Sequence, residues 1–249
     1  MPSRLTSRIF TWTAVAAILI PASAAMAEPD APSGQELIQQ FVELSGGQAA
    51  YEKVQNRVIK ANLDLSDHGM EGTITEVIAP PNYHREIVLD EYDGIRVVSG
   101  VTNGVAWRLN AEKQRAPLEG DEAADLQRHA QLNPFLDWTP MSGEANVVGD
   151  ANLGEDECYR VEITPANDSP LFAFFSKNTG LLRRIDNKAA DAYRYFDDYR
   201  KLDGVLVPHV LRFEFGMWMA NYESVTIEQN ADLDDIKLED PSKTKASQR

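Results

Sequence analysis

The chain has 249 residues and carries 24 Lys and Arg against 39 Asp and Glu, so its formal net charge is −15 at pH 7. This charge excludes non-specific binding to nucleic acid and to an anionic membrane surface, because both depend on a positively charged protein face. Cys158 is the only cysteine, so no disulfide bond can form within the chain. Its strand-like surroundings predict a buried, unreactive thiol.

The first 27 residues have the order of a secretory signal peptide. Arg4 and Arg8 precede the apolar run Ile9–Ile20, and a proline and two small residues at positions 25 and 27 follow it. The alternative is a membrane anchor, but the run is shorter than the roughly 20 residues of a spanning helix. We therefore predict cleavage after Ala27 and a periplasmic protein that begins at Glu28 and has no transmembrane segment. Without the signal peptide, 22 basic and 39 acidic residues remain, a net charge of −17.

Two helices are predicted after this segment. Ser33 and Glu36 have the spacing of a capping box, and apolar residues follow at helical intervals up to Leu44. Two glycines at positions 46 and 47 end this pattern. A second, short helix is predicted over Gln48–Val54.

From Arg57 onward, apolar residues alternate with polar ones, which is the period of a β-strand. Turn sequences such as Asp93-Gly94 and Asn103-Gly104 separate the alternating runs and predict antiparallel hairpins. The first group of predicted strands covers 57–65, 73–78, 83–89, 95–101 and 105–109.

The strand pattern stops at Glu119–Leu132, where a helix is predicted. An apolar, proline-containing segment follows the helix and carries Phe135, Leu136, Trp138 and Met141. The strand pattern then resumes. The second group of predicted strands covers 145–148, 159–164, 171–176, 181–186, 193–199, 205–215 and 217–227.

These elements predict one domain over 28–240 and a polar, disordered tail over 241–249. The predicted fold class is α+β and mainly β, with about ten or eleven strands in one large antiparallel sheet. Such a sheet is expected to curve, because open sheets of more than about 10 strands are seldom flat. The concave side is then where the apolar helices bury their faces.

Several short sequences resemble the LolA-like family of outer-membrane lipoprotein-sorting proteins. NGVAW at 103–107 is similar to the Asn/Asp-Gly-x-x-Trp hairpin of that family, and NTGLL at 178–182 is similar to its turn between late strands. YR at 199–200, followed by DGV at 203–205 and VP at 207–208, resembles its Tyr-Arg…Asp-Gly…Pro strand entry. The order of the elements extends the resemblance over nearly the whole mature chain.

The resemblance implies a half-open β-barrel. In this family the concave apolar face, covered by helices, holds acyl chains or another hydrophobic ligand. The resemblance implies neither a cofactor nor catalysis. No arginine of this chain matches a functional arginine of the family, so that role is not carried over.

The sequence contains no motif for catalysis or metal binding. A Gly-x-Ser-x-Gly nucleophile elbow and a glycine-rich phosphate loop are both absent. The four histidines have no metal-ligand spacing: His68, His84, His129 and His209. We therefore predict no catalytic residue, no metal and no cofactor.

The apolar residues favour a binding function instead. On the predicted strand 205–215, Leu211, Phe213 and Phe215 face one side, and His209 is the one polar residue on that side. Trp107 belongs to a similar stripe, and the apolar segment after the central helix fits an adaptable cover over a ligand. Ordinary core packing is the alternative for each of these residues. The predicted ligand-binding residues are Trp107, Phe135, Leu136, Trp138, Met141, His209, Leu211, Phe213 and Phe215.

The leading hypothesis is a periplasmic carrier of a hydrophobic ligand, either a lipid or the acyl chains of a lipoprotein. The alternative is a structural or regulatory module of the cell envelope that binds a protein partner and no ligand. The third hypothesis is a hydrolase with an unrecognised site, for example a glycosidase with two carboxylates on either side of the scissile bond.

Overall fold

The computed structural model describes residues 31–90, 95–139, 142–165, 169–189 and 191–234. The predicted signal peptide, the tail and the turn at 93–94 lie outside the described residues. So do both ends of the predicted domain 28–240, whose boundaries therefore stay a prediction. Contacts divide the chain into Met1–Ala31 and Pro32–Arg249, and the fold described below is that of the second unit.

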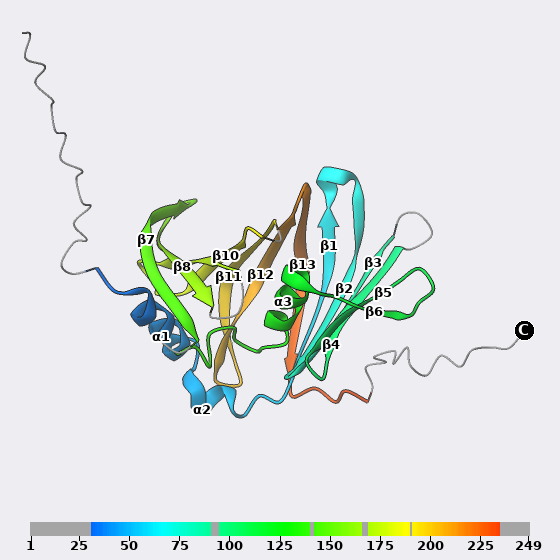
Figure 1. Ribbon diagram of the computed structural model, residues 1–249, viewed down its shortest axis with the longest axis horizontal. Coiled ribbons are helices and arrows are strands. Elements are labelled where there is room, and N and C mark those ends of the chain that lie inside the picture. Colours follow the sequence, from blue (N-terminus) through cyan, green and yellow to red (C-terminus); the bar gives the residue numbers. More distant parts are fainter. Residues whose placement is uncertain (1–30, 91–94, 140–141, 166–168, 190, 235–249) are drawn as a thin grey trace, which may run out of the picture. The chain divides into compact units, whose positions relative to one another are not determined.

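The alternating segments of the sequence are strands. Among the described residues, thirteen strands form one antiparallel sheet (Figure 1). The first six form a meander: β1 (Arg57–Leu65), β2 (Met70–Ala79), β3 (Asn82–Leu89), β4 (Ile95–Thr102), β5 (Val105–Leu109) and β6 (Arg115–Pro117). A short 3-10 helix, η1 (Ser66–His68), connects β1 to β2.

The other seven strands form a second meander: β7 (Gly143–Leu153), β8 (Asp156–Pro165), β9 (Leu171–Ser176), β10 (Leu182–Asn187), β11 (Ala192–Leu202), β12 (Val205–Phe215) and β13 (Trp218–Gln229). The two meanders join where β1 pairs with β13, with Ile59 opposite Ile227. The strand order is therefore β6-β5-β4-β3-β2-β1-β13-β12-β11-β10-β9-β8-β7. Consequently, β6 and β7 are the two edges of the sheet.

The predicted fold class, a large curved and unclosed antiparallel sheet with few helices, is confirmed. The predicted number of ten or eleven strands is too low. One reason is β6, whose three residues are too short to show an alternating pattern.

The connection between β6 and β7 has to pass from one edge of the sheet to the other. It contains α3 (Gly120–His129) and the irregular residues 130–139, which we call the crossover segment. Figure 1 shows this part of the chain, in green, between the two meanders. The strand order therefore requires α3 and the crossover segment to pass over the concave face of the sheet.

The helix α1 (Gly34–Leu44) begins with the capping box that the sequence predicts. The Ser33 Oγ accepts a hydrogen bond from the Glu36 N–H at 3.2 Å, and the Glu36 carboxylate accepts one from the Ser33 N–H at 2.7 Å. The next helix, α2 (Gly47–Tyr51), is shorter than the predicted Gln48–Val54.

The buried face of α1 packs on the second meander. Its Phe41 ring meets Phe135 of the crossover segment at 6.2 Å and Phe175 of β9 at 5.9 Å between ring centroids. Gly34 permits the close approach of the helix, since a Cβ atom there would lie 2.6 Å from the backbone of Ala145 in β7. The helix, the crossover segment and the sheet therefore share one core.

The helix α3 attaches to the first meander through apolar contacts. It ends at His129, three residues before the predicted end. Leu126 of the helix and the adjacent Ala130 are buried in a cluster with Tyr83 of β3 and Val101 of β4. These contacts fix α3 over β3, β4 and β5.

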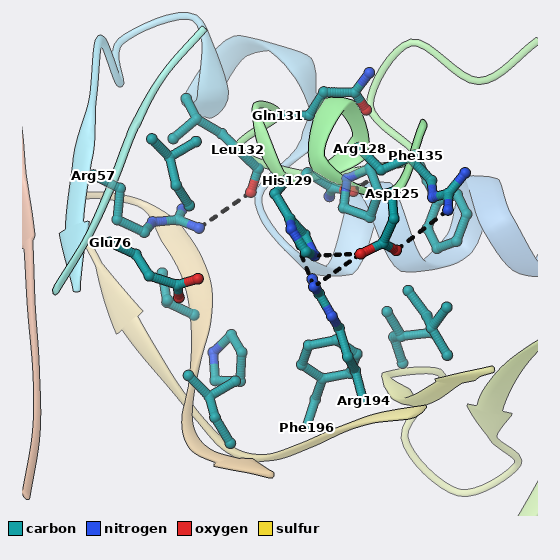
Figure 2. Close-up of a pocket in the computed structure, with 18 of the residues that line it drawn as sticks. Arg57, Glu76, Asp125, Arg128, His129, Gln131, Leu132, Phe135, Arg194 and Phe196 are labelled. Carbon is teal, nitrogen blue, oxygen red and sulfur yellow. Dashed lines mark hydrogen bonds and ion pairs between the residues drawn. The ribbon is translucent and has the colours of Figure 1, made fainter. Parts of the chain in front are cut away.

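Polar contacts attach the same helix to the second meander (Figure 2). The Asp125 carboxylate accepts hydrogen bonds from Asn187 of β10 at 3.3 Å and from Arg128 at 3.2 Å. It also lies 3.7 Å from the Arg194 guanidinium of β11, which in turn donates to His129 Nδ1 at 3.1 Å. Because Leu126 holds one meander and Asp125 holds the other, α3 bridges the two halves of the sheet.

The capping box generates a first prediction. Ser33→Ala removes the side-chain acceptor at the start of α1, so the free energy of unfolding should fall by about 1 kcal/mol. Ser33→Asp restores an acceptor and should stay within a few tenths of a kcal/mol of the wild type. Urea denaturation of the three proteins measures this. An Ser33→Ala protein as stable as the wild type would contradict a structural role for the cap.

The bridge through Asp125 generates a pH-dependent prediction. Burial alone would raise the pKa of Asp125, but Arg194 and Arg128 outweigh it and hold this pKa below its ordinary value of 3.8. The charged carboxylate therefore stabilises the fold above its ordinary pKa, and this contribution is lost as the pH falls through its lower folded pKa.

Asp125→Asn should accordingly lower the free energy of unfolding by about 1–3 kcal/mol at neutral pH. The difference from the wild type should shrink when both proteins are measured below about pH 4. Glu112→Gln, which removes an exposed carboxylate next to β6, serves as the matched control and should change little. A difference that is the same at both pH values would show that Asp125 does not act through its charge.

Candidate ligand-binding cavity

A cavity of about 530 Å³ lies on the concave face of the sheet, beneath the crossover segment. Its walls come from α1, α2, α3 and the crossover segment, and from strands β1–β3 and β8–β13. The volume lies within the range of about 300–1,000 Å³ that is typical of small-molecule sites. The cavity is therefore the candidate functional site.

One end of the cavity is apolar. Side chains of α1, of the crossover segment and of the second meander line it together: Phe41, Phe135, Trp138, Ile163, Leu171, Leu182, Ile185 and Phe196. Most of these residues also belong to the core cluster beneath α1 or pack against it. The core cluster and the apolar part of the cavity wall are therefore continuous.

Four of the predicted ligand-binding residues line this cavity. Phe135 and Trp138 belong to the crossover segment, and Leu211 and Phe213 belong to β12. The prediction that these two segments face each other across a cavity is consistent with their positions.

Three other predicted residues, Leu136, His209 and Phe215, do not line it. Leu136 packs instead on the cluster formed by α2 and the start of β12. The His209 Nδ1 lies 2.9 Å from the Val207 carbonyl oxygen, which gives this histidine a local partner. Phe215 is half exposed near the end of β12 and stacks on Phe213. Met141 lies outside the described residues.

Trp107 does not line the cavity either, because it lies on the opposite face of the sheet. Trp107 of β5, Gly100 of β4 and His84 of β3 share one cross-strand row, and the next row contains Tyr83, which lines the cavity. Because successive residues of a strand face opposite sides, Trp107 points away from the cavity. On that face the Arg115 guanidinium carbon lies 4.1 Å from the centroid of the Trp107 ring, and the Trp107 Nε1–H donates a hydrogen bond to Thr102 Oγ1 at 3.0 Å.

The crossover segment is anchored at several points. The buried Asn133 donates to Ser45 Oγ at 3.1 Å and accepts the Phe135 N–H at 2.9 Å. Phe135 itself is only 4% exposed. Trp138 is half-buried, and its Nε1–H donates to Gln35 Oε1 of α1 at 3.0 Å. The first half of the segment is therefore part of the core rather than a loose cover.

The other end of the cavity is polar, and none of the residues predicted from the sequence belongs to it. Arg57, Glu76, Tyr83, Arg85 and Tyr222 line it from β1, β2, β3 and β13. The signal was present in the alternation of the strands. Glu76 occupies an inward position of β2, and Arg85 lies directly opposite it in β3. A charged pair at inward positions of two neighbouring strands is unusual, and this pattern indicates a polar site.

Burial changes the pKa values of this polar end. It raises the pKa of Tyr83 and of Tyr222, and the nearby Glu76 carboxylate raises both further, so each hydroxyl stays neutral and able to donate. The Tyr83 hydroxyl donates to the Glu76 carboxylate. Burial lowers the pKa of Arg57, whose guanidinium donates to the Leu132 carbonyl at 3.1 Å (Figure 2).

Cys158 is fully buried, as the sequence predicts. Burial raises the pKa of its thiol to about 11, so the thiolate is scarce at neutral pH. In the described part of the chain, no three His, Cys, Asp or Glu side chains are grouped closely enough to hold a metal ion. No helix within the described ranges has both the length and the apolar composition needed to cross a membrane.

Comparisons with known proteins concern the fold. No family model matches the sequence, and no curated protein matches it. Among solved structures, a DUF1329 family protein from Desulfovibrio piger ATCC 29098 is similar with a TM-score of 0.51 and 15% identity, over 84% of this chain and 98% of that chain.

A LolA superfamily protein from Nitrosomonas europaea is also similar, with a TM-score of 0.51 and 11% identity. The similarity covers 83% of this chain and 97% of that chain. Identities this low establish a shared fold and nothing further. The chain therefore has the LolA-like fold that the sequence predicts, in a divergent form.

Proposed function

We propose that this protein is a periplasmic carrier that holds the acyl part of a lipid or lipoprotein in the cavity and performs no catalysis. The observation that carries the proposal is the cavity of about 530 Å³ with a continuous apolar wall beneath α1 and the crossover segment. The signal peptide predicted from the sequence supports export to the periplasm. The LolA-like fold is consistent with a carrier but does not identify a ligand.

The energetics of such a site favour binding of a long apolar chain. Each methylene group that leaves water contributes about 0.8 kcal/mol. The ligand loses translational and rotational freedom on binding, which costs about 4–15 kcal/mol. A long acyl chain therefore binds well only if most of it is enclosed, as the cover formed by α1 and the crossover segment allows.

One observation favours the alternative of an envelope module that binds a protein partner. Phe215, Met217 and Trp218 are exposed together at the turn between β12 and β13, and Met217 is 79% exposed. Clustered exposed apolar residues mark interaction sites. This cluster lies outside the cavity wall, so both functions are compatible with one structure.

A substitution on β12 tests the proposal. Phe213→Glu replaces an apolar side chain of the cavity wall with a hydrated carboxylate, and uptake of the neutral fluorophore N-phenylnaphthylamine should fall about tenfold or more because apolar contact with the ligand is lost. Phe215→Glu makes the same change two residues along the strand, outside the cavity, and should leave uptake unchanged. Equal uptake by both variants and the wild type would contradict a binding role for the cavity.

A second substitution tests the cover. Trp138→Ala removes a half-buried ring and its bond to Gln35, so release of the fluorophore should become several times faster. The expected loss of stability is about 1–2 kcal/mol, less than for a fully buried aromatic residue. Trp218→Ala removes an exposed tryptophan away from the cavity and is the control. Stopped-flow fluorescence gives the rates. If release were as slow in Trp138→Ala as in the wild type, Trp138 would be ordinary core.

A further inference from the structure

The charge of the cavity wall is opposite to that of the chain. Five arginines and three carboxylates line the cavity, a net of two positive charges, in a chain whose formal net charge is −15. Asp125 accounts for one of these carboxylates and is engaged by Arg128 and Arg194 on the α3 side. At the polar end, two arginines, Arg57 of β1 and Arg85 of β3, face one carboxylate, Glu76 of β2.

Arg85 of β3 is the residue at this end whose charge is least satisfied. Its side chain lines the cavity, and its buried Nε has no hydrogen-bond partner. Among the described residues, no hydrogen bond or ion pair engages its guanidinium. Its guanidinium therefore retains hydrogen-bond donors that a ligand in the cavity can use.

The nearby Glu76 carboxylate stabilises the charge of Arg85 but forms no hydrogen bond or ion pair with it. Glu76 of β2 lies opposite Arg85, and its carboxylate accepts a hydrogen bond from the Tyr83 hydroxyl. Burial lowers the pKa of Arg85, but Tyr83, Glu76 and Tyr222 around it raise this pKa overall, so the guanidinium is charged. The Tyr222 hydroxyl also lies at the cavity wall and is neutral.

The polar and apolar ends belong to one elongated cavity. Arg85 lies on β3, whereas Leu182 and Ile185 of the apolar end lie on β10. These strands are six inter-strand steps apart in the sheet, and each step is about 4.8 Å along its curved surface. A ligand that contacts both ends must be long, with a polar group at one end.

We infer that the cavity binds a long-chain amphiphile with an anionic headgroup, a carboxylate or a phosphate, and that Arg85 binds this headgroup while the chain lies in the apolar end. The planar guanidinium suits either anion, because it donates two parallel hydrogen bonds to a pair of oxygens. The inference rests on the proposed carrier function and narrows its ligand class.

Competition against bound N-phenylnaphthylamine tests the inference with three ligands of one chain length. Palmitate and cetyl phosphate are anionic, and methyl palmitate is neutral. We expect the wild type to bind the two anions about tenfold or more tightly than the ester. Arg85→Met should remove this preference and leave binding of the ester unchanged. Tight binding of only one of the two anions would identify which headgroup the site selects.

Two further variants keep the test decisive. Arg160→Met removes an arginine that stacks on Phe172 and does not line the cavity, so it should leave the preference intact. Glu76→Gln removes the competing carboxylate while keeping an acceptor for Tyr83, and it should tighten binding of both anions. This gain is measurable even if Arg85→Met fails to fold.

The outcomes separate the two proposals. Equal binding of all three ligands by the wild type, unchanged in Glu76→Gln, would overturn the anionic site and leave the carrier function standing. Failure of the wild type to bind the fluorophore or any of the three ligands would overturn the carrier function itself.

Discussion

The constraint on which this structure depends is the passage of the chain between the two edges of its sheet. Because β1 pairs with β13 at the centre, each meander ends at an opposite edge, and the β6–β7 connection must span the concave face. That connection contains α3, which bridges the two halves of the sheet through Leu126 and Asp125. It also contains the crossover segment, which places Phe135 and Trp138 over the sheet. The cavity exists because this covering layer leaves space above the strands.

Much of this fold follows from local sequence patterns. The period of two between Val205 and Phe215 predicts β12 with its observed ends, and the spacing of Ser33 and Glu36 predicts the start of α1. The pairing of β1 with β13 is not predictable in this way, since it joins residues far apart in the chain. The strand order, and with it the position of the cavity, depends on that long-range pairing.

The lining of the candidate cavity was predictable where apolar character was the signal. Leu211, Phe213, Phe135 and Trp138 do line the cavity. Trp107 shows the limit of this reasoning, because alternation separates two faces of a strand without revealing which is concave. Arg85 and Glu76 are absent from the predicted site because apolar side chains alone were the signal, although both occupy inward positions of β2 and β3.

A carrier of amphiphiles should bring its ligand through purification. The most direct measurement is native mass spectrometry of the exported protein, purified without detergent, before and after extraction with organic solvent. We predict an adduct of discrete mass that dissociates on activation, is released by extraction and is identified in the extract as an acyl-chain amphiphile. A single mass equal to that of the bare polypeptide, with no lipid in the extract, would contradict a carrier function.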